Sequence, residues 1–346
     1  MSKILMAMSG GVDSTTAAMI LKNQGHEIVG ATLLLHDTES EGILRAKETA
    51  AQLGIDHVVL DKREYFKNTV VKNFTESYKK CITPNPCIYC NRNCKFQLLL
   101  EYAEEEGFDY VASGHYAKVE MSDNGRYVIR KGKDTSKDQS YVLYQLTQEQ
   151  LSRIIMPLGD YTKEEIRQMA RKAGFANAEA KESQDICFIP DGDYAAFIEK
   201  NEEDTAGPAF QPGDFVDRTG KVLGRHKGLV HYTIGQRKGL GLSLPAPMYV
   251  CAKIPQTNQV VLCDNDGLFK KDVVAGNVNL VCMDSINIPI RVSAKVRYSQ
   301  HETMAMVLLV DDKLVVQFEE PVRAPAPGQS LVMYAGDIVV GGGIIE

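Results

Sequence analysis

Residues 4–14 read Ile4-Leu5-Met6-Ala7-Met8-Ser9-Gly10-Gly11-Val12-Asp13-Ser14, and this stretch decides the fold of the chain. The apolar run 4–8 predicts a buried strand, and residues 15–24 predict a helix that ends at Gly25. The turn between them carries two glycines, whose missing Cβ atoms let a ligand approach the backbone closely. The start of the helix adds free N–H groups and a partial positive charge. We therefore expect a phosphate-binding loop at residues 9–14.

The order of residues in this loop excludes two common phosphate-binding motifs. It lacks the lysine of Gly-x-x-x-x-Gly-Lys-Ser/Thr and the spacing of Gly-x-Gly-x-x-Gly. It resembles instead the SGGxDS loop of the PP-loop ATP pyrophosphatases, which implies that a substrate oxygen attacks the α-phosphorus of ATP and that Asp13 helps to hold Mg²⁺. A chance Ser-Gly-Gly turn is the alternative, which the agreement of strand, turn and helix disfavours. The ATP contacts implied in this stretch are Ala7, Met8, Ser9, Gly10, Gly11, Val12, Asp13 and Ser14.

Length and composition are those of a soluble globular protein with two or three domains. The first apolar run is too short for a signal peptide, and no run approaches the length of a membrane span. We therefore expect a cytoplasmic protein without a membrane partner, whose eight cysteines are reduced, catalytic or metal-bound. The net charge of −6 argues against a broad nucleic-acid-binding coat and leaves room for a local basic surface.

Strands alternate with helices in the first part of the chain. Further strands are predicted at 27–35, 57–60 and 110–112, and helices at 41–53, at 64–79 and around Phe96 and Leu99. This alternation predicts a parallel sheet covered on both faces, whose ligands bind beyond the carboxyl ends of the strands. A hairpin is expected at 117–130, and Thr162 with Glu165 predicts a capping box for a helix ending at Gly174.

After about residue 200, short β-branched runs alternate with Gly and Pro turns. We therefore predict an α/β fold: an N-terminal parallel-sheet PP-loop domain, of the adenine nucleotide alpha hydrolase-like type, followed by two small β-rich domains. The expected boundaries are 1–198 for the ATP-binding catalytic domain, 199–267 for a central β-rich domain and 268–346 for a C-terminal β-barrel domain.

Half of the cysteines lie in one short stretch, at Cys81, Cys87, Cys90 and Cys94. Two prolines disfavour regular structure before Cys87, so we expect a constrained loop that enters a helix near Asn91. Cys90 then lies at a helix start beside cationic side chains, where a thiol pKa is depressed. Cys187 lies in a polar-flanked loop, whereas Cys251, Cys263 and Cys282 lie in β-like runs typical of buried, inert thiols.

Several motifs occur together along nearly the whole chain. They are Ser9 to Ser14, Thr83-Pro84-Asn85-Pro86 with Cys90-Asn91, Ser113-Gly114-His115-Tyr116-Ala117, Lys137-Asp138-Gln139-Ser140-Tyr141, Ser183-Gln184-Asp185-Ile186-Cys187-Phe188-Ile189, the segment Tyr232 to Gly241, Arg297-Tyr298 and Pro327-Gly328-Gln329. As a set they resemble the tRNA-specific 2-thiouridylases of the MnmA and TrmU family. The resemblance implies binding of a tRNA anticodon arm, ATP-dependent adenylation of the C2 oxygen of the wobble uridine, and replacement of that oxygen by sulfur.

The resemblance also assigns roles to particular residues. Cys187 would carry a persulfide and Cys90 would be its partner nucleophile, and the two could form a disulfide in an oxidised preparation. Leu33 and Gly114 would line the adenosine. Contacts to tRNA or the target base fall on Asn85, Pro86, Cys87, His115, Lys137, Asp138, Gln139, Arg297, Tyr298 and Gln329. A sulfur-relay protein, a cysteine desulfurase or free sulfide would supply the sulfur.

One position departs from the family pattern Asn-Pro-Asp-x-x-Cys, because Cys87 replaces the acidic residue. Three thiolates, Cys87, Cys90 and Cys187, can hold a [4Fe–4S] cluster with one open iron that binds sulfide. This cluster-dependent hypothesis has two rivals: the persulfide route, and a zinc site at Cys81, Cys87, Cys90 and Cys94, whose spacing is irregular.

Two functional alternatives stay open at the level of sequence. One is another adenylating PP-loop enzyme, such as an argininosuccinate or NAD synthetase, which needs no paired thiols. The other is a non-enzymatic RNA-binding or iron–sulfur scaffold protein. Conversion of ATP to AMP that depends on unmodified tRNA would separate them, and Asp13→Ala is expected to abolish this turnover with the fold intact.

Overall fold

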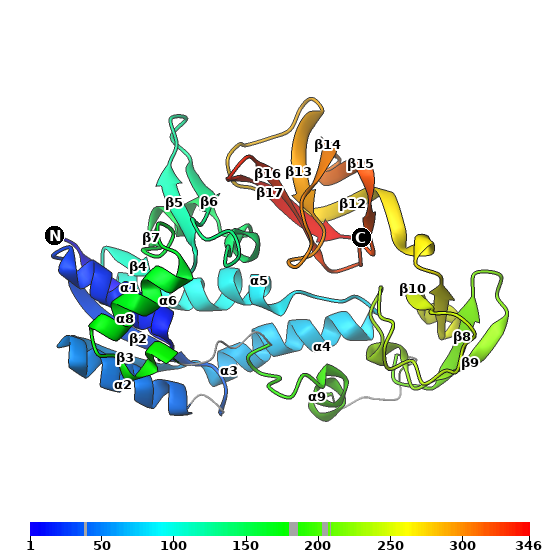
Figure 1. Ribbon diagram of the computed structural model, residues 1–346, viewed down its shortest axis with the longest axis horizontal. Helices are drawn as coiled ribbons and strands as arrows, with labels where there is room; N and C mark the ends of the chain where they lie inside the picture. Colours follow the sequence, from blue (N-terminus) through cyan, green and yellow to red (C-terminus); the bar gives the residue numbers. More distant parts are fainter. Residues whose placement is uncertain (38–39, 180–185, 203–206, 208) are drawn as a thin grey trace.

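The computed structural model describes residues 1–37, 40–179, 186–202, 207 and 209–346. Its N-terminal part is built on a parallel sheet with the strand order β3-β2-β1-β4-β7 (Figure 1). The strands are β1 (Lys3–Ala7), β2 (Glu27–Leu34), β3 (Asp56–Asp61), β4 (Tyr110–Ala112) and β7 (Ile154–Ile155). The predicted parallel sheet is confirmed, and β7 is an additional strand, too short to give a periodic signal in the sequence.

Helices cover this sheet on both sides (Figure 1). They include α1 (Val12–Asn23), α2 (Ser40–Leu53) and α8 (Lys163–Lys172), the last with the predicted capping box at Thr162 and Glu165. Helix α1 begins at Val12, earlier than predicted, because Gly11 takes the extended N-cap conformation and the Val12 side chain is buried. Asp13 and Ser14 therefore lie in the first helical turn rather than in the loop.

Two longer helical segments each contain a π-helical turn. The first runs through α3 (Arg63–Phe66), η2 (Lys67–Val71) and α4 (Lys72–Lys79). The second runs through α5 (Pro86–Cys90), η3 (Asn91–Lys95) and α6 (Phe96–Glu105). A π-turn inserts one residue into the helix and redirects the side chains beyond it, and such turns are frequent at functional sites.

The prediction that the second helix starts near Asn91 is wrong. The helix begins at Pro86, because Asn85 accepts a hydrogen bond from the Ile88 amide at 3.4 Å and a proline is well suited to the first helical position. Cys87 therefore lies in the first turn. Cys90 lies a full turn into the helix and is 4% exposed, so the exposed helix start predicted for Cys90 is not observed.

The second half of the chain is β-rich, as predicted. A sheet in the order β10-β11-β8-β9 is followed by a barrel, in which β12 pairs with both β15 and β17 and so closes the ring β12-β15-β14-β13-β16-β17. The strands are β8 (Gly213–Asp217), β9 (Val222–His226), β10 (Tyr249–Ile254), β11 (Gln259–Cys263), β12 (Phe269–Leu280), β13 (Ile290–Lys295), β14 (Thr303–Val310), β15 (Lys313–Arg323), β16 (Ser330–Ala335) and β17 (Ile338–Ile345). Leu314, Val316 and Phe318 alternate with exposed residues along β15, as expected for a barrel wall.

A hairpin ties the N-terminal part to the barrel. Strands β5 (Ala117–Met121) and β6 (Tyr127–Lys131) form the predicted hairpin, and β6 pairs with β17 through Arg130 and Ile338. The remaining helical segments are η4 (Ser140–Leu143), α7 (Gln148–Ser152), η5 (Ala176–Glu179), α9 (Tyr194–Asn201), η6 (Leu229–His231), η7 (Pro255–Thr257) and η8 (Asp266–Leu268). None of the helices in the described part of the chain is long and apolar enough to cross a membrane.

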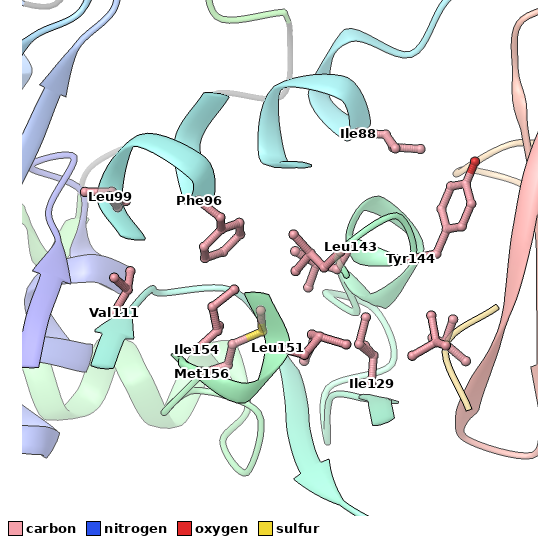
Figure 2. Packing of buried hydrophobic residues seen from close by; sticks show 14 of the residues in the cluster. Ile88, Phe96, Leu99, Val111, Ile129, Leu143, Tyr144, Leu151, Ile154 and Met156 are labelled. Carbon is pink, nitrogen blue, oxygen red and sulfur yellow. The ribbon is translucent and has the colours of Figure 1, made fainter. Parts of the chain in front are cut away.

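The largest hydrophobic cluster joins the parallel sheet to the barrel. Figure 2 shows Phe96 and Leu99 of α6 and Val111 of β4 on one side, and Leu143 and Tyr144 at the end of η4 on the other. Tyr144 also contacts the barrel, because its hydroxyl donates a hydrogen bond to the hydroxyl of Ser330 in β16 at 3.1 Å. This shared core, which includes Val111 of β4 and Val332 and Tyr334 of β16, joins the barrel to the N-terminal domain.

Candidate nucleotide and thiol site

The glycine loop after β1 is shaped by close backbone contacts. Gly10 has φ +75°, and a Cβ atom there would lie 2.3 Å from the Gly42 carbonyl oxygen, so only glycine fits. The Ser14 hydroxyl lies 3.2 Å from the Ser9 amide, from which it accepts a hydrogen bond. Asn177 donates to the Gly10 carbonyl at 3.0 Å. The loop is therefore preformed, with the first turn of α1 beneath it.

A cleft of about 510 Å³ opens at the carboxyl ends of β1, β2 and β4. It lies where the strand order reverses between β1 and β4, which is where open α/β sheets bind ligands. Its lining brings together residues that the sequence predicted from separate motifs: Ala7, Met8, Ser9, Asp13, Ser14, Leu33, Gly114, His115, Gln139 and Cys187. Gly10, Gly11 and Val12 shape the loop, and the described lining does not include them.

The loop carboxylate, Asp13, is held by Lys163, which the sequence did not single out, and by Tyr116, a member of the predicted motif at 113–117 for which no role was predicted. Lys163 of α8 donates to both of its carboxylate oxygens at 2.8 Å, and the Tyr116 hydroxyl donates to Oδ1 at 2.6 Å. Lys163 is 7% exposed. Removing one partner of a buried ion pair leaves a charge without compensation. We therefore expect Asp13→Ala to destabilise the fold, which nothing in the sequence indicated.

Cys187 reaches the cleft because its neighbour Phe188 is anchored below it. The Phe188 ring packs edge-on against Phe66 and Phe74, with ring centroids 5.4 and 5.5 Å apart. Cys187 itself is exposed and lines the cleft. Cys90 is buried in the same hydrophobic cluster as Phe188, so the structure brings the elements that carry the two predicted sulfur-handling cysteines together.

Lys95 is the cation of this thiol cluster, which we define as Cys87, Cys90, Cys94 and Cys187. Burial lowers the pKa of Lys95, but the nearby thiol groups of Cys90, Cys187, Cys87 and Cys94 together outweigh it, so the pKa is raised overall. Lys95 also lines the cleft. A positive charge at this place favours thiolate over thiol, which is the reactive form of cysteine.

The buried thiols of Cys90 and Cys94 interact with each other. A hydrogen bond to the Cys90 sulfur, followed by burial, raises the pKa of Cys94, so Cys94 stays protonated and acts as the donor. Burial raises the pKa of Cys87, and Lys95 opposes that shift. All eight cysteines belong to the described residues and are present as thiols, so the Cys90–Cys187 disulfide is not formed in this state.

The thiol cluster does not have the geometry of a metal site. Among the residues that the structure describes, no three His, Cys, Asp or Glu side chains converge on a position that could hold a metal ion. The packing does not favour the zinc hypothesis, because Cys81 packs on the hydrophobic cluster of the central domain, whereas Cys90 and Cys94 belong to the cluster around Phe188. Lys95 is instead the partner that the four thiols share.

His115 follows β4 and faces the cleft as a neutral base. Burial, and then the charge of Lys95, lower the pKa of His115 to about 3. Its Nδ1 lies 2.6 Å from the Ser113 hydroxyl, and its ring packs against Phe96 with centroids 5.8 Å apart. His115 therefore meets a bound ligand as a hydrogen-bonding group without charge.

The lowered pKa of His115 predicts an acid-sensitive fold. Between about pH 3 and the ordinary value of 6.5, the unfolded chain binds a proton that the folded chain excludes, so the free energy of unfolding decreases as pH falls through this window. By pH 5 the loss is about 2 kcal/mol. We expect His115→Gln to flatten this pH dependence in urea unfolding, and the exposed His301→Gln to leave it unchanged. Equal slopes for all three proteins would contradict the assignment.

Two of the motifs predicted to contact tRNA lie together on one surface of the structure. Tyr298 is exposed, and its hydroxyl donates to the Asp138 carbonyl at 3.1 Å, so the motifs at 137–139 and 297–298 meet at one surface. Gln139 continues this surface into the cleft. The Arg297 guanidinium donates to the carbonyls of Ile234 and Ala324 at 2.7 and 3.0 Å, and its phosphate contact stays a prediction.

The C-terminal motif clamps the loop that precedes Cys87. Gln329 donates to the Thr83 and Pro84 carbonyls at 3.0 and 3.3 Å, and the Thr83 amide donates to the Pro327 carbonyl at 2.9 Å. These contacts fix the start of the helix at Pro86 from the barrel side. The predicted residues Ser183, Gln184 and Asp185 lie outside the described residues.

The parallel sheet, its Ser-Gly-Gly loop and the cleft at the strand switch define a nucleotide-binding enzyme of the PP-loop class. Residues 2–191 match the family model described as tRNA methyl transferase HUP domain, 206–264 the tRNA methyl transferase PRC-barrel domain and 270–345 the aminomethyltransferase beta-barrel domain. The chain is 45% identical over 359 residues to the tRNA-specific 2-thiouridylase MnmA of Acetivibrio thermocellus, covering 99% of each chain. It therefore belongs to the MnmA family of tRNA-specific 2-thiouridylases.

Other comparisons agree with this family or show only a distant likeness. The tRNA-specific 2-thiouridylase MnmA of Clostridioides difficile is 44% identical over 357 residues, covering 99% of this chain and 98% of that one. Among solved structures, the U34-tRNA thiolase NcsA from Methanococcus maripaludis with its [4Fe-4S] cluster gives a TM-score of 0.37 at 19% identity, covering 58% of this chain and 68% of that one. A likeness at this level carries no argument about the site.

Proposed function

We propose that this enzyme binds ATP in the cleft, binds the anticodon arm of a tRNA over it, and converts the wobble uridine to 2-thiouridine. The observation that carries the proposal is the composition of the cleft, whose lining includes both the glycine loop and the pair Lys95 and Cys187. Activation of the base and delivery of sulfur would then occur in one continuous space. Membership of the MnmA family supports this assignment.

In the first step the C2 oxygen of the base attacks the α-phosphorus of ATP. The bond to pyrophosphate breaks, pyrophosphate leaves, and the base becomes an adenylate whose oxygen is a good leaving group. The loop N–H groups and the start of α1 hold the polyphosphate. Leu33 and Gly114 line the side of the cleft where the adenosine would lie.

A magnesium ion fits this step through Asp13, the loop carboxylate that lines the cleft. Bound to the phosphates, Mg²⁺ would neutralise part of their charge. Asp13 already accepts three hydrogen bonds from Lys163 and Tyr116, so it can offer Mg²⁺ one oxygen at most.

In the second step a Cys187 persulfide attacks C2 through its terminal sulfur, and AMP leaves with the original oxygen. Cys90 then attacks the Cys187 sulfur of the mixed disulfide. The bond between the two sulfurs breaks, 2-thiouridine departs, and a Cys90–Cys187 disulfide remains for a dithiol reductant to open. The hydrogen bond from Cys94 and the charge of Lys95 favour Cys90 as a thiolate for this attack.

The alternative route through a [4Fe–4S] cluster at Cys87, Cys90 and Cys187 has less support, because the described residues contain no group of three His, Cys, Asp or Glu side chains arranged to hold a metal ion. We therefore derive no step through a cluster. Anaerobic purification followed by iron and acid-labile sulfide analysis tests this choice. We expect less than one iron atom per chain with thiolation retained; a cluster that Cys87→Ser removes together with activity would overturn the persulfide route.

The surface at 137–139 and 298 is the part of the enzyme that we assign to tRNA. Tyr298 offers an exposed ring for stacking on a base, and its contact with Asp138 places it beside Lys137. A persulfide carrier protein, a cysteine desulfurase or free sulfide would load Cys187, which is exposed at the cleft.

The experiment that tests the activation step measures AMP formation from ATP with and without unmodified tRNA. We expect tRNA to increase the rate roughly 100-fold or more, because the attacking oxygen belongs to the base. tRNA that already carries 2-thiouridine should not stimulate the reaction. AMP formation that is independent of tRNA would favour another adenylating PP-loop enzyme.

A further inference from the structure

The charge on the phosphate loop has the same sign as the charge on the triphosphate that the loop is proposed to bind. Residues 9–14 contain one charged side chain, Asp13, which has the same sign as a triphosphate, and they lack the lysine of other phosphate loops. Yet Asp13 lines the cleft, and its side chain is 29% exposed. The start of α1 supplies only a partial positive charge to offset it.

The compensating cation comes from α8, far along the chain. The Lys163 ammonium lies 2.8 Å from each oxygen of the Asp13 carboxylate, and its side chain is 8% exposed. Helix α8 packs beside α1 in Figure 1, and a small hydrophobic cluster that includes Val12 and Ala170 joins the two helices. The packing of α8 on α1 therefore holds the Asp13–Lys163 pair next to the phosphate loop.

Hydrogen bonds at the start of α8 position Lys163 so that its side chain reaches the phosphate loop. Lys163 is the first residue of α8, where the Thr162 hydroxyl accepts from the Glu165 amide at 3.3 Å and Glu165 accepts from the Thr162 amide at 2.6 Å. The Lys163 amide donates to Asp134 at 3.0 Å. With its backbone held at both ends, the side chain reaches Asp13 with little further loss of conformational entropy.

The hydrogen bonds to Asp13 also determine what the carboxylate can still do. Oδ1 accepts from both Tyr116 and Lys163, which uses its two lone pairs, whereas Oδ2 accepts from Lys163 and keeps one lone pair. A metal ion at this single position would leave the Lys163 pair intact. The neutralised pair lets a polyphosphate approach a carboxylate that would otherwise repel it.

We propose that Lys163 is the positioning cation of the phosphate loop: it fixes Asp13 and neutralises its charge, so that the polyphosphate of a nucleoside triphosphate can bind. This inference rests on the proposed ATP site. It requires the charge of Lys163 for binding of the phosphates and not for binding of the nucleoside.

The test compares the binding of ATP and of adenosine to purified full-length protein by calorimetry, without tRNA. In Lys163→Met we expect ATP to bind roughly 10- to 100-fold more weakly. The reason is that Asp13 loses its ion pair with Lys163, so an uncompensated carboxylate faces the phosphates. Adenosine should bind within about twofold of wild type, since it has no phosphate. Lys163→Arg, which retains the charge, should recover most of the ATP affinity.

Lys133→Met is the matched control. Lys133 pairs with Glu165 at 2.8 Å at the same end of α8, but it is half exposed and its partner lies outside the cleft lining. We expect it to change neither affinity. If Lys163→Met does not fold, the double variant Asp13→Asn with Lys163→Met removes both buried charges and should bind adenosine normally.

Because the double variant has no uncompensated carboxylate, we expect it to bind ATP within about threefold of wild type. Three outcomes would overturn the proposal: unchanged ATP affinity in Lys163→Met, equal losses for ATP and adenosine in Lys163→Met, or a loss of ATP affinity of roughly tenfold or more in the double variant. Failure of the proposed function would be seen elsewhere. Wild-type protein that binds ATP with the expected dependence on Lys163, but forms no 2-thiouridine, would refute the reaction and leave the role of Lys163 standing.

Discussion

Cys187→Ser is expected to lower the formation of 2-thiouridine by roughly 10³-fold or more, because serine cannot carry a persulfide. Adenylation of the base does not use the Cys187 sulfur, so the first turnover should still release pyrophosphate in the presence of tRNA. Rapid-quench measurement of pyrophosphate and nucleoside mass spectrometry of 2-thiouridine separate the two steps. Cys282→Ser, a half-buried thiol that packs on the barrel core, is the matched control and should leave both steps unchanged.

The partner variant, Cys90→Ser, should fail at a later step. Without Cys90 the mixed disulfide between Cys187 and the base has no internal nucleophile to open it. A covalent adduct of protein and tRNA should therefore accumulate on a non-reducing denaturing gel and disappear when a dithiol is added. Normal 2-thiouridine yield in Cys90→Ser without reductant would contradict the role of Cys90.

Asp13→Ala has the second large expected effect, and it concerns stability as well as activity. The variant should lose ATP-dependent turnover and also destabilise the fold by about 3–5 kcal/mol, because the buried Lys163 ammonium loses its counter-ion. Adding Lys163→Met should recover most of this stability without restoring turnover. Urea unfolding of the single and double variants measures both effects.

Asp61→Ala provides the comparison for this stability effect. Asp61 pairs with Arg63 at 2.7 Å, and both side chains are about half exposed. Loss of an exposed pair costs at most about 1 kcal/mol. If Asp13→Ala proves as stable as Asp61→Ala, the Asp13–Lys163 pair is not the buried element that we describe.

The strand, glycine loop and helix at the N-terminus could be predicted because their signals are local. Apolar periodicity and paired glycines are properties of consecutive residues, and they place the loop at the end of a strand whatever the rest of the chain does. The same is true of the hairpin at 117–130 and of the capping box at Thr162 and Glu165.

The start of the helix that carries Cys90 has a local sequence signal that our prediction did not include. The two prolines before Cys87 disfavour regular structure, which predicts a helix only near Asn91. Asn85 followed by Pro86 is in fact a favourable start for a helix, because asparagine caps the first turn and proline suits the next position. The burial of Cys90 has no such signal, since it depends on packing in the cluster around Phe188.

The contacts of Lys163 and Tyr116 with Asp13 could not be predicted from the sequence. The two residues meet Asp13 across separations of 150 and 103 residues, and nothing near either residue indicates the pairing. Arg297 has a structural contact that the sequence also did not indicate: its guanidinium donates to the carbonyls of Ile234 and Ala324, which link the central domain to the barrel. Its contact with RNA stays a prediction. Charge roles of this kind depend on the tertiary fold.

The central claim is that one cleft both activates the base with ATP and delivers sulfur from Cys187. The most direct test loads Cys187 with a ³⁵S-labelled persulfide, removes the excess donor, and adds ATP and unmodified tRNA for a single turnover. We predict that the label appears in 2-thiouridine at the wobble position, with one AMP released for each sulfur transferred, and that omission of ATP prevents the transfer. Label that stays on the protein while AMP is formed, or that reaches tRNA without ATP, would contradict the account.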